Sequence, residues 1–297
     1  MPSLDYRGDA QVELLGTFKR RYGNEYDKLP TKAENAPAGG FFLGNGMFGS
    51  VDAEILYCMI RHVKPKRIVE VGSGWTTLLA VQALNKNGQE GSPGEMVSID
   101  PVAPGFVYDQ GATIIKKPLQ DIPEALDALE PGDILLTDTS HIFVANHEID
   151  YVLRKMENLE GVYVHFHDIF LPNAYPEEWE SRKYDEQLHL VDFLFNHPGW
   201  EVVVGSAWLH QYESAFLAGT FKTYDQDRPI PPGSFWLMKP SRVEEIQRVA
   251  DAALEGSGIT AKVEQAPVPT RPHEFQSDRG GKKCLVCGKT MRAKVHA

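Results

Sequence analysis

Short apolar segments alternate with helix-like segments along the first 240 residues, and this order constrains the fold more than any other feature. Most of the apolar segments contain β-branched residues, and most close on glycine, proline or an ionisable residue (67–74, 95–101, 112–118, 132–141, 162–170, 200–207 and 233–240). Most of the segments between them have helical spacing, and further helices precede the first strand (8–23, 51–63, 76–84, 123–129, 145–157 and 184–198). This alternation predicts an α/β fold, with a seven-stranded, mostly parallel sheet and helices on both of its faces.

Ionisable side chains gather where the predicted strands end. Asp100 closes the second strand, Asp138 and His141 follow the fourth, and His167 and Asp168 follow the fifth. In open α/β sheets, ligands bind beyond the carboxyl ends of the strands, near the point where strand order reverses. We therefore expect a functional site at this edge of the sheet.

The segment "VEVGSG" (69–74) stands between the first strand and the helix after it. Its two glycines suit a tight turn in which the backbone approaches a ligand. An acid that closes the next strand, here Asp100, can accept both hydroxyls of a ribose. The third glycine of the dinucleotide fingerprint is absent, and so is the lysine-containing loop that binds triphosphates. The order of these features indicates a nucleoside-containing cofactor.

Two longer stretches carry a family resemblance: "FGSVDAEILYCMIRHVKPKRIVEVGSGWTTLLA" and "HDIFLPNAYPEEW" with the segment that follows it. They resemble the methyltransferase domain 24 branch of the class I S-adenosylmethionine-dependent methyltransferases, over about residues 40–240. The resemblance implies a Rossmann-like seven-stranded sheet whose last strand is antiparallel. It also implies that the chain is an enzyme with S-adenosylmethionine as its cofactor.

The same resemblance suggests which residues bind the cofactor. Their family positions are the glycine turn, the second strand end and the segment after the third strand (Glu70, Gly72, Ser73, Gly74, Asp100 and Asp121). From the residues alone, two of these have another explanation. Asp100 can be an ordinary turn residue before a proline, and Asp121 can be the N-cap of the helix predicted over 123–129.

Some relatives with a D-x-x-H sequence at the fourth strand use the aspartate as a metal ligand and the histidine as a general base. The resemblance makes Asp138 a ligand candidate and His141 the base candidate, with His167 and Asp168 beside them as catalytic or metal-binding residues. Those relatives carry two acids where this chain has His167-Asp168. Because hard cations prefer oxygen ligands, a softer metal or no metal stays open.

The expected reaction follows from what methyl transfer requires. A sulfonium is already a good leaving group, so the enzyme must mainly activate and orient the nucleophile. A base or a metal helps an oxygen nucleophile more than an amine. We therefore expect O-methylation of a small hydroxylated metabolite or a sugar. A nicotinamide-dependent oxidoreductase on a similar sheet and a non-catalytic binding protein that keeps the fold are the alternatives.

Other residues near the site have structural interpretations. His165 lies deeper in the fifth strand and is expected to be a hydrogen-bonded core histidine. Residues 171–187 are predicted to form a substrate lid, whose Tyr175, Trp179 and Tyr184 either stack on a substrate ring or pack the lid onto the domain. Helical spacing predicts that the helix after the lid mainly supplies core residues (Leu188, Val191, Leu194 and Phe195).

The chain divides into three parts on this interpretation. Residues 1–50 form an N-terminal helix and a cofactor-side loop, 51–241 the main domain with its lid, and 242–297 a helix with a flexible tail. The tail contains Cys284-x-x-Cys287. With His273 and His296 the two thiols can bind zinc, or they can stay reduced in a mobile tail.

Composition excludes several partners. The formal net charge of −11, with no long basic run, argues against nucleic acid and anionic membranes. Only three cysteines and the lack of a long apolar run favour a cytoplasmic protein. We expect a small-molecule substrate, and a homo-oligomer is compatible with the sequence.

Overall fold

The computed structural model describes residues 4–242, 248, 275–278, 281–284 and 290–291. The chain separates into two compact units, residues 1–247 and residues 248–297. Each is described by itself.

The first unit is built on a seven-stranded sheet in the order β3-β2-β1-β4-β5-β7-β6. Its strands are short (β1 Arg67–Val71, β2 Glu95–Ile99, β3 Thr113–Ile115, β4 Ile134–Thr137, β5 Tyr163–Phe166, β6 Glu201–Gly205 and β7 Phe235–Met238). The strand β7 pairs antiparallel with both β5 and β6, and β1 to β5 pair in parallel. The predicted sheet and its single antiparallel strand are confirmed. Strand order reverses between β1 and β4, which places the switch point beside the glycine turn.

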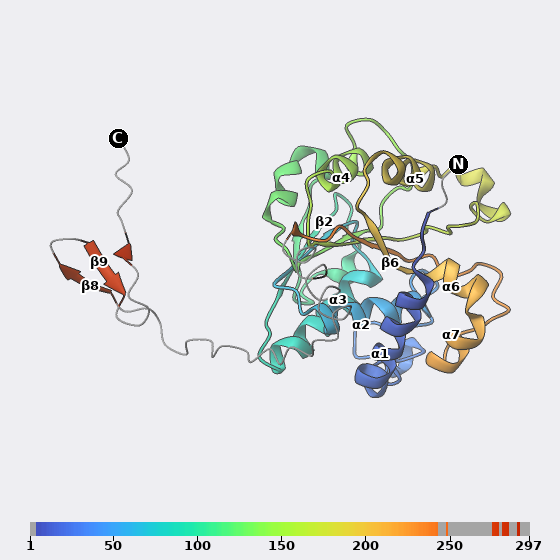
Figure 1. Ribbon diagram of the computed structural model, residues 1–297. Helices are drawn as coiled ribbons and strands as arrows, with labels where there is room; N and C mark the ends of the chain where they lie inside the picture. The colour runs from blue at the N-terminus through green and yellow to red at the C-terminus, as the bar shows by residue number, and fades with distance from the viewer. Residues whose placement is uncertain (1–3, 243–247, 249–274, 279–280, 285–289, 292–297) are drawn as a thin grey trace, which may run out of the picture. The chain divides into compact units, whose positions relative to one another are not determined.

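Helices cover both faces of this sheet (Figure 1). Three helices pack on one face (α1 Gly8–Tyr26, α2 Asp52–Val63 and α3 Trp75–Gln89), and two on the other (α4 Glu148–Met156 and α5 Glu186–Asn196). Strand residues alternate between the two apolar layers: Ile68 and Leu136 join the α1–α3 side, whereas Val69 and Leu135 join the α4–α5 side. None of the described helices is long and apolar enough to span a bilayer.

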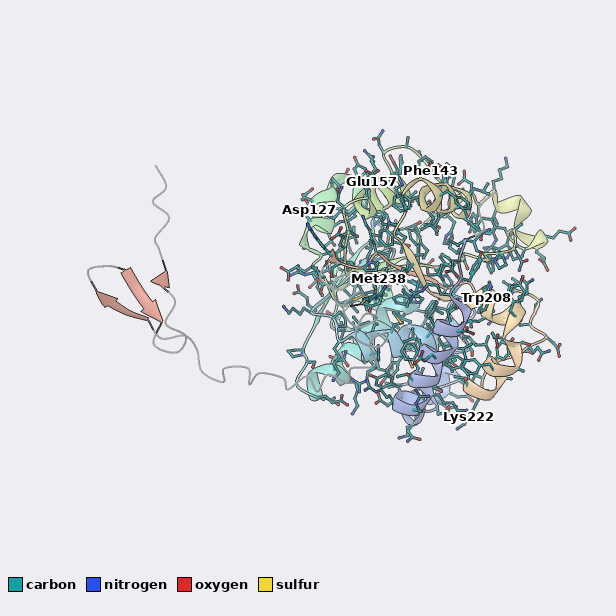
Figure 2. All side chains as sticks on the ribbon, viewed as in Figure 1. Asp127, Phe143, Glu157, Trp208, Lys222 and Met238 are labelled. Atoms are coloured by element: carbon teal, nitrogen blue, oxygen red, sulfur yellow. The ribbon has the colours of Figure 1, made fainter. Side chains whose placement is uncertain are left out.

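Side chains fill both layers around the sheet (Figure 2). Ion pairs at the periphery fix connecting segments to the helices: Asp127 pairs with Lys155 at 2.7 Å, and Lys222 with Asp27 at 2.5 Å. Exposed pairs of this kind contribute about 0–1 kcal/mol each. The stability of the unit therefore comes mainly from its two apolar layers.

Local structure departs from the sequence predictions at a few points. Residues predicted as a helix over 123–129 form a 3₁₀ helix, one of five such turns (η1 Ala33–Asn35, η2 Gly105–Val107, η3 Leu119–Asp121, η4 Pro123–Ala128 and η5 Glu177–Arg182). Two helices after β6 were not predicted (α6 Ser206–Tyr212 and α7 Ser214–Thr220). In α5, Leu188 and Phe195 are exposed by 68% and 46%, so their assignment to the core is wrong. The fully buried side chains of that helix are Glu186, Gln187, Leu190 and Phe193, because its first turn is used for polar contacts.

The described part of the second unit is a small antiparallel sheet in the order β10-β9-β8 (β8 Phe275–Asp278, β9 Gly281–Cys284 and β10 Thr290–Met291). Cys284 is the last residue of β9. Cys287, His273, His296 and most of the predicted helix from 242 to about 254 lie outside the described residues. The zinc site of the tail stays a prediction.

Candidate functional site

A cavity of about 340 Å³ lies at the carboxyl ends of β1, β2 and β4. Thirteen residues line it, drawn from the three strand ends, the turn after β3 and the start of α4 (Val71, Gly72, Ile99, Asp100, Pro101, Val102, Pro118, Leu119, Gln120, Asp138, Thr139, Ser140 and Glu148). Its size is that of a small-molecule site. Since it lies at the switch point of the sheet, it is the position at which this fold binds its ligand.

The glycine turn after β1 forms one wall of this cavity. Gly72 has a φ of +92°, and a Cβ built on it would lie 1.8 Å from the carbonyl oxygen of Asp138. The backbone amide of Ser73 donates to Oδ2 of Asp100 at 2.8 Å. The turn is thus packed on the loop after β4 and hydrogen-bonded to the end of β2. Three of the predicted cofactor residues, Gly72, Ser73 and Asp100, are brought together here, and Gly74 begins α3 as its N-cap.

Glu70 has a different position from the one that the resemblance implies. Its carboxylate is fully buried and accepts hydrogen bonds from the hydroxyls of Thr76, Thr77 and Ser98, at 2.6, 2.6 and 2.5 Å. Burial raises the pKa of Glu70 to about 7. Because all three donors flank the glycine turn or β2, Glu70 braces the turn from behind. It does not line the cavity.

The structure brings Gln120, not Asp121, to the cavity. Asp121 is exposed and ends η3, and the following helix is capped without a side-chain hydrogen bond. Gln120 lines the cavity beside Leu119, and its Oε1 atom is buried with no hydrogen-bond partner among the described residues. A buried amide oxygen of this kind is costly unless a ligand pairs with it. The family pattern missed Gln120 because the 3₁₀ turn places this residue, and not Asp121 after it, at the cavity.

Four predicted catalytic side chains converge at the ends of β4 and β5. Nε2 of His141 lies 3.5 Å from Oδ1 of Asp138 and 3.4 Å from Oδ2 of Asp168. Nδ1 of His167 lies 3.6 Å from Oδ1 of Asp138 and 3.5 Å from Oδ1 of Asp168. We call Asp138, His141, His167 and Asp168 the His–Asp cluster. Asp138 also lines the cavity, so the cluster and the cavity share a wall.

Glu186 is a cluster neighbour that the sequence did not reveal. It is the first residue of α5, is 2% exposed, and its Oε2 lies 2.8 Å from Nδ1 of His141. The carbonyl oxygen of His141 accepts the backbone amides of Asp185 and Glu186. The imidazole and the backbone carbonyl of His141 are therefore both bonded to the start of α5, and Nε2 faces the two aspartates.

Asp52 is a second neighbour found only in the structure. It begins α2, and its two carboxylate oxygens accept the backbone amides of Gly233 and Ser234 at 2.9 Å. Its Oδ2 also lies 4.0 Å from Nε2 of His167. The sequence showed Asp52 only as a first-turn acid of a helix, because these contacts join segments about 115 to 182 residues apart.

Electrostatics in the cluster favour protonated imidazoles. Burial works against the charge on His167, yet Asp168 and Asp138 raise its pKa to about 9. His141 is also buried, and Asp138 and Glu186 raise its pKa well above the usual value. Despite its own desolvation, Asp138 has a lowered pKa because the two imidazoles attract its negative charge. The cluster is built to hold and exchange protons.

His165 differs from the two cluster histidines. Burial lowers its pKa to about 3, so the ring is neutral. Its Nε2 is 2.9 Å from the hydroxyl of Ser234, and its ring packs against Trp236 at 4.7 Å between centroids. These contacts are those of the core histidine that the sequence predicted.

Asp138, His167 and Asp168 are the residues that the sequence suggests as metal ligands. Within the part of the chain that the structure describes, no three histidine, cysteine, aspartate or glutamate side chains converge to hold an ion. In the arrangement that the structure shows, Nε2 of His141 and Nδ1 of His167 face carboxylate oxygens of Asp138 and Asp168 at 3.4–3.6 Å. The metal site of the cluster stays a prediction.

The predicted lid closes over the cluster through its aromatic side chains. The ring of Tyr184 lies 4.8 Å from that of His141, between centroids. Trp179 is 8% exposed and packs edge-on against Phe170 and Tyr184, so it attaches the lid to the domain. Gln187 accepts the amide of Phe170 at 2.6 Å and donates to the carbonyl of Asn173 at 2.8 Å. The first turn of α5 thus fixes both the lid and His141.

Comparison with known proteins gives a family match in this region. Residues 69–169, which span β1 to the end of β5, match the family described as "Methyltransferase domain". An uncharacterized protein of Archaeoglobus fulgidus is 31% identical over 116 residues. The match covers 37% of this chain and 49% of that relative, so the chain spans about half of its length.

Two solved methyltransferases share partial likeness with this chain. The O-methyltransferase from Bacillus cereus in complex with S-adenosylhomocysteine (SAH) has 11% identity and a TM-score of 0.42, covering 80% of this chain and 93% of that one. MycE from the mycinamycin biosynthetic pathway, in complex with Mg, SAH and mycinamycin VI, has 14% identity and a TM-score of 0.32. That alignment covers 71% of this chain and 50% of MycE.

Proposed function

We propose that this chain, in which residues 69–169 match a methyltransferase domain, transfers a methyl group from S-adenosylmethionine to a hydroxyl oxygen of a small molecule. The proposal depends mainly on one observation: the cofactor cavity and the His–Asp cluster have Asp138 in common. Asp138 lines the cavity and lies 3.5 Å from Nε2 of His141. A cofactor in the cavity is therefore next to a histidine that can take a proton.

The cofactor-binding residues have roles that suit this ligand. The main chain at Gly72 lets the cofactor approach closely, Asp100 can accept the ribose hydroxyls, and Gln120 can accept the exocyclic amine of adenine. The glycine turn lacks the third glycine of the dinucleotide fingerprint, which disfavours a nicotinamide dinucleotide.

The chain's own residues can then carry out the proton transfer. Bound S-adenosylmethionine supplies a methyl group on a sulfonium sulfur, which is a good leaving group. Glu186 accepts the Nδ1 proton of His141 as a hydrogen bond. The base form of His141, which arises when its Nε2 proton passes to water, therefore carries its lone pair on Nε2, toward the acceptor hydroxyl. As the acceptor oxygen bonds to the methyl carbon and the sulfur–carbon bond breaks, the hydroxyl proton moves to Nε2. Asp138 and Asp168 stabilise the imidazolium that results.

A metal-assisted route is the other way to activate a hydroxyl at this site. Asp138, His167 and Asp168 would be its ligands, but their present geometry supports proton transfer by His141 instead. We further propose a cytoplasmic enzyme with a small-molecule substrate and with neither nucleic acid nor membrane as partner.

Replacement of Gln120 tests the cofactor assignment. We expect Gln120→Ala to weaken SAH binding by about tenfold, the cost of one hydrogen bond to a desolvated group. Asp121→Asn is the matched control and should bind SAH as the wild type does, because Asp121 does not line the cavity. Isothermal titration calorimetry of SAH and of NAD⁺ measures both points. Binding of NAD⁺ in place of SAH, or equal losses in the two variants, would contradict the assignment.

Replacement of Glu186 tests how His141 is held. Loss of the buried carboxylate in Glu186→Gln removes one of the groups that raise the pKa of His141, so this pKa should fall. Asp185→Asn is the control, since Asp185 bonds to the amide of Phe143 and not to the imidazole. Histidine ring resonances followed by NMR across the pH range give the pKa directly. An unchanged His141 pKa in Glu186→Gln would show that the glutamate does not position the base.

A further inference from the structure

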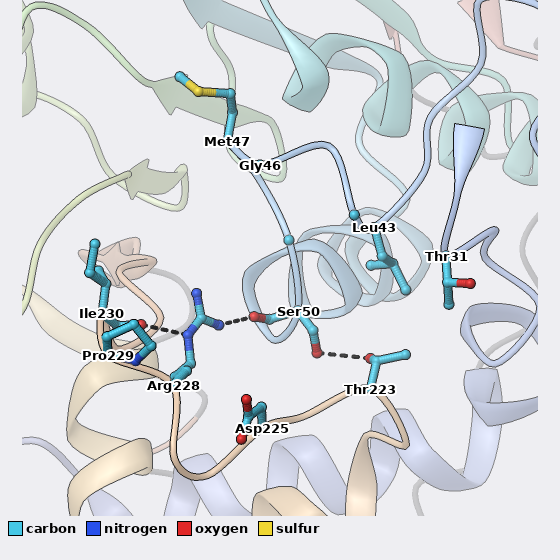
Figure 3. A pocket seen from close by; sticks show the side chains of 12 residues that line it. Thr31, Leu43, Gly46, Met47, Ser50, Thr223, Asp225, Arg228, Pro229 and Ile230 are labelled. Atoms are coloured by element: carbon cyan, nitrogen blue, oxygen red, sulfur yellow. Dashed lines mark hydrogen bonds between the residues drawn. The ribbon is translucent and has the colours of Figure 1, made fainter. Parts of the chain in front are cut away.

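A second cavity, of about 620 Å³, opens between the loop over residues 43–50 and the loop over residues 223–230 (Figure 3). We call it the loop cavity. Its apolar wall is formed by Leu43, Met47, Pro229 and Ile230. Its volume suits a small metabolite, and the cofactor assignment leaves it without a role.

Arg228 is the only cation among the residues that line the loop cavity. It donates from Nη1 to the carbonyl oxygen of Ser50 and from Nε to that of Ile230, which fixes the guanidinium between the two loops (Figure 3). Among the described residues, no carboxylate lies within 4 Å of it as an ion-pair partner. In a chain with a net charge of −11, an arginine held by carbonyls and left without a carboxylate is available to an anionic ligand.

The floor beside Arg228 is polar. The hydroxyls of Ser50 and Thr223 are 2.9 Å apart, and both bond to the carboxyl group of Glu54 beneath them. Glu54 is 2% exposed, and its Oε2 has no hydrogen-bond partner among the described residues. Burial raises the pKa of Glu54.

The loop cavity is joined to the His–Asp cluster through His167. Nδ1 of His167 faces Asp138, which lines the cofactor cavity, and Nε2 faces Asp52. Asp52 stands two positions after Ser50, which lines the loop cavity. Phe48, from the loop between Met47 and Gly49, packs on the His167 ring at 5.0 Å between centroids. On the opposite side, Ile230 packs against the lid cluster of Phe170 and Trp179. Phe48 and Asp52, which flank the cavity residues Gly49 and Ser50 in the sequence, therefore connect the loop cavity to His167.

We propose that the loop cavity binds the methyl acceptor, and that Arg228 holds a carboxylate or phosphate group of that acceptor. The inference rests on the proposed function, since only a methyltransferase needs an acceptor here. Asp225 lines the same cavity, and one of its oxygens accepts the amide of Asp227. The other oxygen can accept a hydroxyl of the same ligand. The acceptor is thus a hydroxylated acid or a phosphorylated polyol.

Direct binding of small anions tests the inference without any turnover. Inorganic phosphate and acetate are the two probes, titrated in low-ionic-strength buffer and followed by calorimetry and by the Arg228 side-chain Nε resonance. We expect the wild type to bind at least one probe, and Arg228→Gln to bind it at least about tenfold more weakly, the loss of one charge-assisted contact. Asp227→Asn is the control on the same loop, because Asp227 is exposed and does not line the cavity. It should bind as tightly as the wild type or more tightly.

The outcomes separate the two proposals. Phosphate without acetate binding identifies a phosphate group, and the reverse identifies a carboxylate. If neither probe binds, or if Arg228→Gln and Asp227→Asn lose affinity equally, the inference is overturned even where SAH binds. If a probe binds at Arg228 but SAH does not bind the chain, the anion site stands and the proposed methyltransferase falls.

Discussion

Replacement of His141 by alanine should reduce methyl transfer by about 10²- to 10⁴-fold while SAH affinity stays unchanged. Nε2 of the imidazole faces Asp138, which lines the cofactor cavity, and His141 itself does not line that cavity. Its loss removes the proton acceptor and leaves the glycine turn, Asp100 and Gln120 in place. Incorporation of a labelled methyl group from S-adenosylmethionine into an extract of small metabolites measures the effect.

His197→Ala is the control for this experiment. His197 is the C-cap of α5 and is partly buried. Its Nδ1 lies 3.0 Å from the carbonyl oxygen of Phe193 and its Nε2 lies 3.9 Å from Oε1 of Glu157, so its contacts are remote from the His–Asp cluster. It should retain full activity. Undiminished transfer by His141→Ala would eliminate the base assignment, and transfer lost together with SAH binding would show that His141 acts on the structure of the site.

Replacement of Gly72 by alanine is expected to abolish SAH binding and to lower the free energy of unfolding by several kcal/mol. A side chain at φ +92° costs on the order of 1–3 kcal/mol in the backbone alone. The added Cβ also meets the Asp138 carbonyl at 1.8 Å, and neither partner is a flexible side-chain end. The turn must move away from β4, which deforms the cavity wall. Urea unfolding and calorimetric titration with SAH measure the two effects.

Gly91→Ala separates the two costs. Gly91 has a similar φ of +85°, but a Cβ there would meet no atom within 4 Å. It should show the backbone cost only and bind SAH normally. Equal stability of the two variants, with SAH still bound by Gly72→Ala, would mean that the turn is not packed on the β4 loop as described.

Much of the framework was predictable because it depends on local patterns. The β-branched segments and the helical spacing between them gave the strand and helix order, and the parallel topology then brought Asp138, His141, His167 and Asp168 to one edge. The residues that line the cavity were harder to predict. Whether Gln120 or Asp121 faces the cavity depends on the conformation of a 3₁₀ turn. Short helices such as α6 and α7 have too few residues for a clear period.

Contacts between distant segments were beyond the sequence. Glu186 meets His141 across 45 residues, and Asp52 meets the amides of residues 233 and 234 across about 180. Nothing in the surrounding residues distinguishes these two acids from ordinary first-turn acids of a helix. Arg228 was missed for the same reason, because its role follows from two loops that meet only in the folded chain.

A crystal structure of the full chain with SAH, from crystals grown with Mg²⁺, shows where the cofactor binds and whether a metal or His141 acts at the site. We expect adenine at Gln120, the ribose hydroxyls on Asp100, and the sulfur directed toward Nε2 of His141. We expect no cation among Asp138, His167 and Asp168. Density for SAH elsewhere, or its sulfur turned away from the His–Asp cluster, would contradict the claim. A cation bound by those three residues would replace the histidine base with a metal-assisted route.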